Sequence, residues 1–180
     1  MSRLAVLLAG GRGARLAPYT AVFPKPLVPI GDMPVADILV RQLAAAGFDD
    51  ICFCAGHLAE LLEAYFMSHP LRGRGVRFRW VREGEPLGTA GPLRLVEDLP
   101  ERFLVLNGDL LTTLDFGTFF DRHAESGADL TIAVQRHQHR TQLGVVRHEG
   151  DRVTGYEEKP SFSFDVSMGV YAYSRSCIET

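Results

Sequence analysis

Short apolar runs alternate with amphipathic segments through the first two thirds of the chain. Arg3 to Ala9 is rich in leucine, valine and alanine and stops at a pair of glycines, which is typical of a buried strand that ends in a loop. Residues 35–46 carry apolar side chains at helical spacing, and Gly47 follows them in the place of a C-terminal helix cap. The first unit is therefore predicted to be strand, loop and helix.

The same alternation continues to residue 124, and strand patterns dominate after residue 128. An alternating pattern of this kind favours an α/β fold with a mostly parallel sheet and helices on both faces, which the later strands extend or flank in mixed orientation. The further predicted strands are 51–55, 76–80, 103–106, 130–134, 145–146, 153–156 and 168–173, and the further helical segments are 58–66, 93–99 and 116–124.

Composition narrows the classes of protein. A chain of 180 residues, 46% of them hydrophobic, suits one well-buried core, so residues 1–180 are predicted to form a single domain. The net charge is −3 and the cations are scattered, which argues against a nucleic-acid partner. The short apolar stretches and the lack of a secretory signal predict a cytoplasmic protein without a membrane segment. Cys52 and Cys54 are expected to be reduced core thiols.

The stretch LAGGRGARLAPYTAVFPKP, residues 8–26, carries the candidate chemistry. It leaves the first strand through three glycines, which let backbone N–H groups turn toward a ligand and form a concave anion site. Its cations add fixed positive charge that can hold phosphate oxygens. The sequence therefore predicts a polyphosphate site. The glycines are Gly10, Gly11 and Gly13, and the cations are Arg12, Arg15 and Lys25.

Other phosphate motifs fit this loop poorly. The chain contains no Gly-Lys pair, which excludes a P-loop. A dinucleotide fingerprint would need Gly or Ala in place of Leu16 and an acid at the end of the second strand, where Ala55 and Gly56 stand. A plain surface turn with incidental arginines is disfavoured because ordinary connections have only about 4–6 residues.

The loop, extended to Ile30, resembles the signature of the sugar-1-phosphate nucleotidyltransferases, which include mannose-1-phosphate guanylyltransferases and glucose-1-phosphate thymidylyltransferases. The resemblance continues through EPLGTAGPL (85–93), LNGD (106–109), YEEKP (156–160) and SMGVYAYS (167–174), and so covers nearly the whole chain. It implies a three-layer, Rossmann-like fold of the GT-A-like type. The implied reaction joins a nucleoside triphosphate to a sugar 1-phosphate and releases pyrophosphate.

The resemblance also implies roles for individual residues. Arg15 should hold the leaving pyrophosphate, Lys25 should neutralise charge near the reacting phosphates, and Asp109 should bind Mg²⁺. A helix or turn cap is the alternative role for Asp109. The residues implied in nucleotide binding are Leu8, Ala9, Gly10, Gly11, Gly13, Glu85, Gly88, Thr89 and Gly108.

Three parts of this assignment have structural alternatives. The Gly88–Thr89 pair, implied in base recognition, can equally be an N-cap. Glu158 and Lys159, implied in binding the sugar and its phosphate, can be a solvated ion pair. Gly144 and Gly169, implied in lining the sugar pocket, can mark bulges instead.

Three functions remain for the whole protein. The first is the enzyme, with EPLGTAGPL favouring a mannose-1-phosphate guanylyltransferase, and the second is a non-catalytic subunit that binds a nucleotide sugar and regulates a partner. A glycosyltransferase is the third, but it would need an acidic pair such as Asp-x-Asp, whereas Asp109 precedes two leucines. A homo-oligomer stays open for any of them.

The C-terminal end carries a further expectation. Residues 174–180 stop where the pattern predicts the start of a helix, so the domain is expected to lack its C-terminal part. The family's second Mg²⁺-binding aspartate lies downstream of the matched motifs. The resemblance then implies that this form is weakly active or inactive.

Overall fold

The computed structural model of the chain describes residues 2–11, 13, 16–84, 87–88 and 90–178. It separates into two compact units. Unit 1 comprises Met1–Ile132 with Gly169–Thr180, and unit 2 comprises Ala133–Met168. Among the described residues, all three α-helices belong to unit 1.

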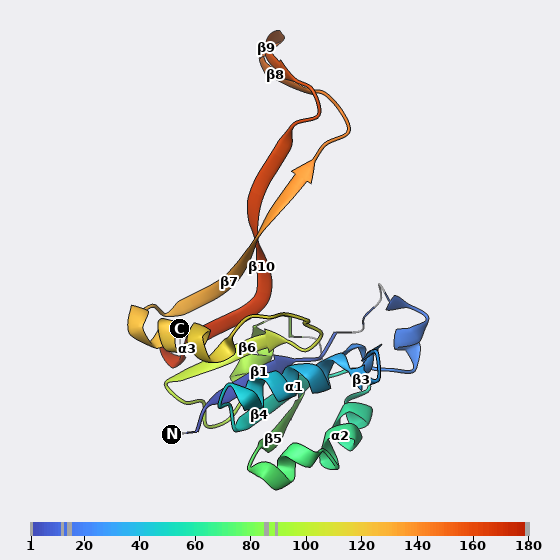
Figure 1. Cartoon of the computed structure of the whole chain (residues 1–180), viewed down its shortest axis with the longest axis vertical. Helices are drawn as coiled ribbons and strands as arrows, with labels where there is room; N and C mark the ends of the chain where they lie inside the picture. The colour runs from blue at the N-terminus through green and yellow to red at the C-terminus, as the bar shows by residue number, and fades with distance from the viewer. Residues whose placement is uncertain (1, 12, 14–15, 85–86, 89, 179–180) are drawn as a thin grey trace. The chain divides into compact units, whose positions relative to one another are not determined.

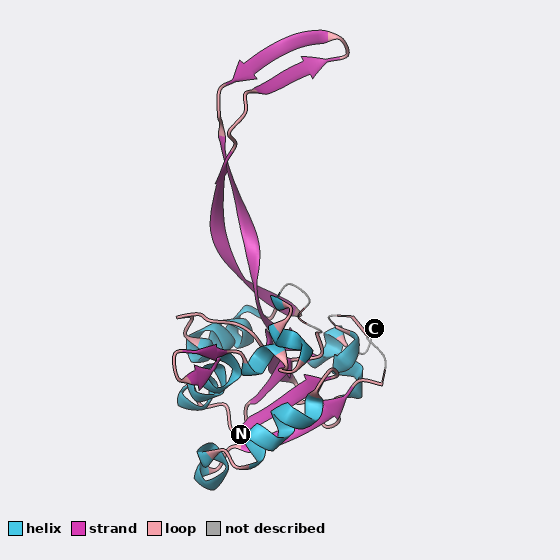
Figure 2. Ribbon diagram, turned by 90° about the vertical axis from the view of Figure 1, so that its right-hand side faces the viewer, coloured by secondary structure: helices cyan, strands magenta, loops and turns pink. Residues whose placement is uncertain are grey.

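A mixed β-sheet forms the centre of unit 1 (Figure 2). Its strand order is β5-β4-β1-β6-β10-β7. β1 pairs in parallel with β4 and β6, and β4 pairs in parallel with β5. β10 is antiparallel to β6. The predicted mostly parallel sheet with a mixed extension is confirmed. The strands are β1 (Leu4–Leu8), β4 (Asp50–Ala55), β5 (Arg77–Arg82), β6 (Arg102–Asn107), β7 (Leu130–Arg140) and β10 (Ser161–Ser174).

Three α-helices cover one face of this sheet: α1 (Val35–Ala45), α2 (Ala59–Met67) and α3 (Phe116–Ser126) (Figure 1). Phe53 of β4 packs on Phe66 of α2, with ring centroids 4.7 Å apart. Phe120 of α3 meets Phe48 edge to face at 5.4 Å. Gly47 has φ +86° after α1, in agreement with the cap that the sequence predicts.

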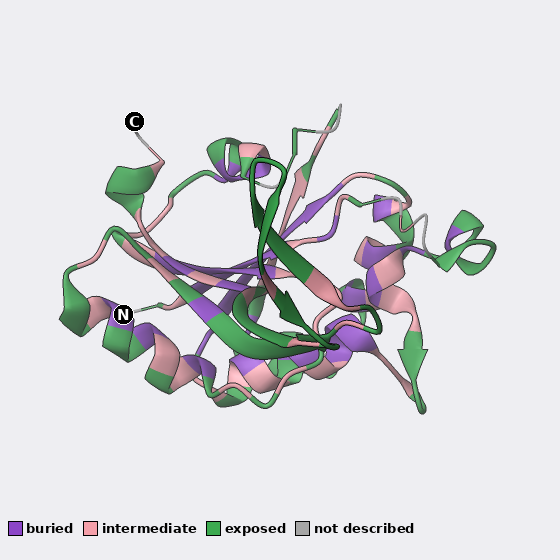
Figure 3. Cartoon of the chain, turned by 90° about the horizontal axis from the view of Figure 1, so that it is seen from above, coloured by how far each residue is buried: buried purple, intermediate pink, exposed green. Residues whose placement is uncertain are grey.

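The opposite face of the sheet has no α-helix in the described part of the chain. Its core contains side chains from β1, β4 and β6, and Leu93 and Val96 of the segment 91–99 pack on them. The regular part of that segment is the 3-10 helix η5 (Gly91–Leu95). Figure 3 shows the buried central strands. Cys52 and Cys54 are buried free thiols in this core, which confirms their predicted state.

The described part of the long loop between β1 and α1 contains only short elements. Its described residues include no α-helix, in agreement with the prediction from its prolines. In the described chain, the longest α-helices have 11 residues, and none is suited to crossing a bilayer. The short elements of the loop are η2 (Tyr19–Ala21), η3 (Lys25–Leu27), β2 (Pro29–Ile30) and β3 (Met33–Pro34). Outside the loop, the described chain contains two further short 3-10 helices, η4 (Pro70–Arg74) and η6 (Arg175–Cys177).

Unit 2 contains the outer parts of β7 and β10 and the hairpin of β8 (Val145–Glu149) with β9 (Arg152–Glu157). The hairpin is antiparallel and has an irregularity between Arg147 and His148. Its turn contains Gly150 at φ +57°. The strands predicted over 145–146 and 153–156 are both present, as β8 and β9.

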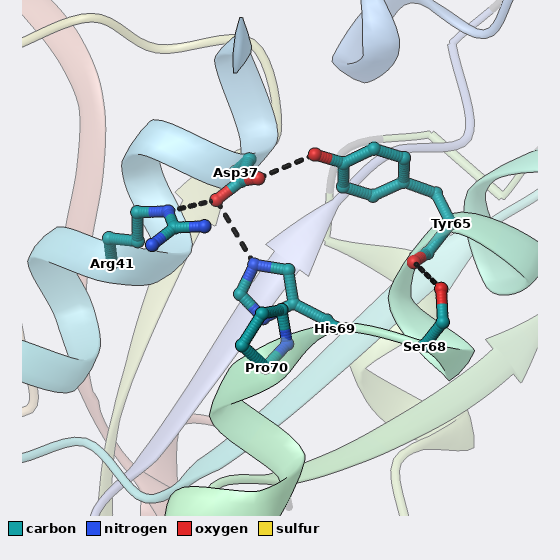
Figure 4. Close-up of a pocket in the computed structure, with 6 residues that line it drawn as sticks. All are labelled: Asp37, Arg41, Tyr65, Ser68, His69 and Pro70. Atoms are coloured by element: carbon teal, nitrogen blue, oxygen red, sulfur yellow. Dashed lines mark hydrogen bonds and ion pairs between the residues drawn. The ribbon is translucent and has the colours of Figure 1, made fainter.

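A buried polar cluster joins α1 to α2 (Figure 4). Asp37 Oδ1 accepts hydrogen bonds from Arg41 Nε at 2.5 Å and His69 Nε2 at 3.1 Å, and Oδ2 accepts one from Tyr65 at 2.5 Å. His69 Nδ1 accepts the Leu71 N–H, so the ring proton is on Nε2. The cluster lines a hollow of about 230 Å³.

These hydrogen bonds determine the protonation of Asp37. Burial alone would raise its pKa, but the bonds from Arg41, Tyr65 and His69 outweigh burial and lower the pKa below the ordinary 3.8. Burial and the bond to Asp37 raise the pKa of Tyr65 to about 12. At neutral pH the Asp37 carboxylate is therefore ionised and the Tyr65 hydroxyl is neutral.

Asp37→Asn should destabilise the protein, because it removes the charge that three donors share in a buried position. We expect a loss of about 2–4 kcal/mol in the free energy of unfolding at pH 7, measured by urea titration. The stabilisation by Asp37 is complete above the ordinary pKa of 3.8 and is lost as the pH falls through the lower folded-state pKa. The difference between variant and wild type should therefore shrink at about pH 3.5, and equal stabilities at pH 7 would refute this account.

Candidate active site

Three parallel strands end at the same edge of the sheet in unit 1. Leu8, the last residue of β1, is in register with Cys54 of β4 on one side and Asn107 of β6 on the other. The loops that follow these strands therefore start side by side. Ligands of open α/β sheets bind at the carboxyl ends of the strands, where these loops lie.

The first residues of the loops form a hydrogen-bonded frame. The Ala9 N–H donates to the Cys54 carbonyl at 2.7 Å, and the Gly108 N–H donates to the Leu8 carbonyl at 2.8 Å. A Cβ added to Gly108 would lie 3.1 Å from Leu8 O and 3.4 Å from the Pro26 ring. Leu8, Ala9 and Gly108 thus form the base of the site. The N–H groups of Ala9 and Gly108 are both hydrogen-bonded within the protein.

Gly10 and Gly11 come next, and Gly10 has a carboxylate beside it. A Cβ on Gly10 would collide with Glu83 Oε1 at the end of β5. Glu83 Oε2 accepts the Leu87 N–H at 3.3 Å and so holds the loop after β5. Sequence reasoning missed Glu83, although an acid directly after a half-buried strand was a visible signal. Gly11 is exposed, and a Cβ there would meet nothing within 4 Å.

Lys25 and Asp109 form an ion pair. Lys25 is the first residue of η3, and Asp109 follows Gly108 after β6. The contact between Gly108 and Pro26 brings the two chain segments together. Both side chains keep solvent access, with 31% and 25% of their surfaces exposed. Lys25, which the resemblance assigns to the reacting phosphates, therefore meets Asp109, which it assigns to Mg²⁺, at the glycine loop, although the two are 84 positions apart.

Among the described residues there is no group of three or more His, Cys, Asp or Glu side chains that could hold a metal ion. Asp109 is the one predicted metal ligand. Its partly exposed carboxylate suits Mg²⁺, which usually keeps several waters and needs only one or two protein carboxylates beside substrate phosphates.

Several predicted residues lie outside the described part of the chain. They are Arg12, Arg15, Glu85 and Thr89. Gly88, between the last two of these, is exposed and has φ +76°, a backbone conformation that favours glycine.

Unit 2 brings together three of the residues implied in sugar-phosphate binding. The Tyr156 hydroxyl donates to Glu158 Oε2 at 2.6 Å, and a Cβ on Gly144 would collide with that hydroxyl. The bond to Glu158 raises the pKa of Tyr156. Lys159 Nζ lies 3.9 Å from Glu158 Oε1. Tyr156 belongs to the YEEKP motif, but sequence reasoning assigned it no role.

Gly169, the fourth such residue, belongs to unit 1. It is buried at φ +72°, and a Cβ there would lie 2.9 Å from Cγ of Asn107. Asn107 ends β6, next to Gly108 and Asp109. Gly169 is therefore at the edge of the sheet where the ion pair of Lys25 and Asp109 lies.

Comparison with known proteins identifies the family of this chain. A family model described as nucleotidyl transferase matches residues 4–180. D-glycero-alpha-D-manno-heptose 1-phosphate guanylyltransferase of Aneurinibacillus thermoaerophilus is 31% identical over 178 residues, which cover 97% of this chain and 76% of that protein. The chain belongs to the nucleotidyl transferase family, as its motifs predict.

Two further relatives show the extent of the similarity. Mannose-1-phosphate guanylyltransferase catalytic subunit beta of Danio rerio is 35% identical over 94% of this chain and 49% of that protein. A crystal structure of HddC from Yersinia pseudotuberculosis, complexed with GMP-PN, has a TM-score of 0.73 and 26% identity, covering 98% of this chain and 79% of that one. The chain spans about half the length of several curated relatives that it matches.

Proposed function

We propose that this protein transfers a nucleoside monophosphate from a nucleoside triphosphate to a sugar 1-phosphate and releases pyrophosphate. The observation that supports this most is the meeting of Lys25 and Asp109 at the glycine loop, where the parallel strands end. A cation and a metal-binding carboxylate beside backbone N–H groups are what a phosphoryl-type transfer needs, because positioning and charge neutralisation supply most of its catalysis.

In the proposed reaction an oxygen of the sugar phosphate attacks the α-phosphorus as pyrophosphate leaves in line. A phosphate monoester has a second pKa of about 6, so it is already an anionic nucleophile at neutral pH and needs no general base. The Lys25 ammonium offsets the charge that develops on the phosphate oxygens. Mg²⁺ held at Asp109 would supply further charge neutralisation. Arg15, assigned to the leaving pyrophosphate, is part of the proposal through the family motif.

The proposal divides the remaining predicted residues between the two substrates. We assign the nucleotide to the glycine loop after β1, to Gly108 after β6 and to the loop after β5. We assign the sugar phosphate to Glu158, Lys159, Gly144 and Gly169. The Tyr156 hydroxyl holds one Glu158 oxygen and leaves the other near Lys159, which supports a joint role for this acid and base. The residues assigned to the nucleotide are Leu8, Ala9, Gly10, Gly11, Gly13, Glu85, Gly88, Thr89 and Gly108.

We further propose GTP and mannose 1-phosphate as the substrates. The motif EPLGTAGPL, the names of two relatives as guanylyltransferases and the GMP-PN complex of a third support guanine. A single nucleotidyltransferase domain over residues 1–180 and a cytoplasmic location complete the proposal. The family match through both units supports the single domain. The free thiols of Cys52 and Cys54 in the core support the cytoplasmic location, because disulfides are rare in that compartment.

A substrate panel tests the proposed function. GTP, dTTP, UTP, CTP and ATP are each combined with mannose 1-phosphate or glucose 1-phosphate and Mg²⁺, and both pyrophosphate release and the thermal midpoint are measured. We expect the fastest release with GTP and mannose 1-phosphate and the largest stabilisation by GTP. If a nucleoside triphosphate raises the thermal midpoint but none of the substrate pairs gives pyrophosphate release, a non-catalytic binding subunit would be favoured. No stabilisation and no release with any triphosphate would refute the proposal.

A further inference from the structure

Thr20 is a buried residue between exposed stretches of the loop, because residues 16–19 and 21–23 are all exposed. It is 4% exposed, whereas its neighbour Tyr19 is 73% exposed and Val22 is 64% exposed. The Thr20 hydroxyl donates a hydrogen bond of 2.9 Å to the carbonyl of Gly13. The one buried polar group of η2 is therefore directed at the last glycine of the phosphate loop.

Gly13 adopts a left-handed backbone conformation that two hydrogen bonds hold in place. Its φ is +60°, in the left-handed region that residues with a Cβ rarely adopt. Its carbonyl also accepts the Leu16 N–H at 2.9 Å. Two hydrogen bonds thus hold one peptide group, and backbone turns of this kind direct successive N–H groups toward an anion.

The methyl group of Thr20 fixes the other side of the turn. A Cβ at Gly13 would come within 2.8 Å of Thr20 Cγ2 and 3.3 Å of Lys25 Cβ. Gly13, Thr20 and the stem of Lys25 are therefore packed against one another, and Lys25 continues to its ion pair with Asp109.

We propose that Thr20 is a positioning residue for the triphosphate. Its hydroxyl and methyl group hold the turn at Gly13 against the base of Lys25, so that the glycine N–H groups and the Lys25 ammonium keep a constant separation before the nucleotide arrives. This inference rests on the proposed function and adds a residue to it. Thr20 acts through Gly13 and Lys25, so its loss should weaken triphosphate binding selectively.

Two substitutions separate the hydroxyl from the rest of the side chain. Thr20→Val keeps the shape and removes the hydrogen bond to Gly13, and Thr20→Ser keeps the hydroxyl and removes the methyl group. The matched control is Thr131→Val. Thr131 lies on β7, away from the glycine loop, and its hydroxyl is hydrogen-bonded to Nδ1 of His123 in α3 at 2.8 Å. Thermal midpoints verify that all three variants fold.

Calorimetric titrations with GTP–Mg²⁺, with inorganic tripolyphosphate and with mannose 1-phosphate give the test. Thr20→Val should raise the Kd for GTP and for tripolyphosphate about tenfold, which is the effect of one lost hydrogen bond, and leave the Kd for mannose 1-phosphate unchanged. Thr20→Ser should restore most of the affinity, and Thr131→Val should bind as wild type does.

Each other outcome has a definite meaning. If wild type and Thr20→Val bind tripolyphosphate and GTP equally, the inference is wrong while the proposed function stands. An equal loss for all three ligands together with a lower thermal midpoint also overturns it, because Thr20 would then serve only the fold. If wild type binds no triphosphate, the proposed function fails and the inference fails with it.

Discussion

Lys25→Met should lower the rate of pyrophosphate release at least about 100-fold, because it removes a fixed positive charge beside the phosphates in a partly desolvated site. The stem of methionine retains the contact with Gly13, and the pair with Asp109 is partly solvated. The fold should therefore persist, with a thermal midpoint changed by less than about 2 °C. Steady-state kinetics with GTP and mannose 1-phosphate measure the effect on kcat.

The chain contains a matched control for this substitution. Arg3, at the amino end of β1, pairs with Asp121 of α3 at 2.8 Å on the opposite edge of the sheet from Lys25. Arg3→Met removes one cation from one ion pair and should leave kcat unchanged. Equal losses in Arg3→Met and Lys25→Met would mean that net charge, and not the position of Lys25, matters.

Asp109→Asn should have an effect of similar size with a different signature. The amide keeps the shape of the carboxylate but loses the charge that Mg²⁺ requires, so kcat should fall about 100-fold or more. The Mg²⁺ concentration for half-maximal rate should rise at least about tenfold, because the remaining ligands would be waters and phosphates. A magnesium titration of pyrophosphate release measures both quantities.

Asp121→Asn is the control for the aspartate, as the partner of Arg3. It should show the Mg²⁺ dependence of wild type. An Asp109→Asn variant with unchanged Mg²⁺ dependence would favour the other role for Asp109, a cap on the turn after β6.

Most of the fold follows from periodicity, and the exceptions have local causes. The parallel strands and α1, α2 and α3 lie where apolar runs and helical spacing predict them. The helix predicted over 93–99 is instead the 3-10 helix η5. Pro100 disfavours a helical conformation for the residue before it, Val96 is extended at the end of η5, and Asp98 has φ +51°, so the helix does not continue. β10 begins seven residues before the predicted strand: its first half, in unit 2, alternates polar and apolar residues as Ser-Phe-Ser-Phe-Asp-Val, a strand signal that the prediction did not use.

The candidate site was predictable where the residues belong to a motif. The glycines, Lys25 and Asp109 were found this way, and the structure places the lysine beside the aspartate. Thr20 and Glu83 were not found, since each acts through a contact between irregular segments that no periodic pattern encodes. The Asp37–His69 hydrogen bond was not predicted for the same reason, because it joins two helical segments 32 residues apart in the sequence.

The central claim is that the loop after β1 encloses the triphosphate, and NMR with ¹⁵N-labelled glycine tests it most directly. The chain has 18 glycines, of which Gly47 and Gly127 follow α1 and α3 and serve as internal references. On titration with GTP and Mg²⁺ we predict the largest amide shifts at Gly10, Gly11 and Gly13, with the references unchanged. Saturable GTP binding that leaves those three signals unmoved would contradict the account.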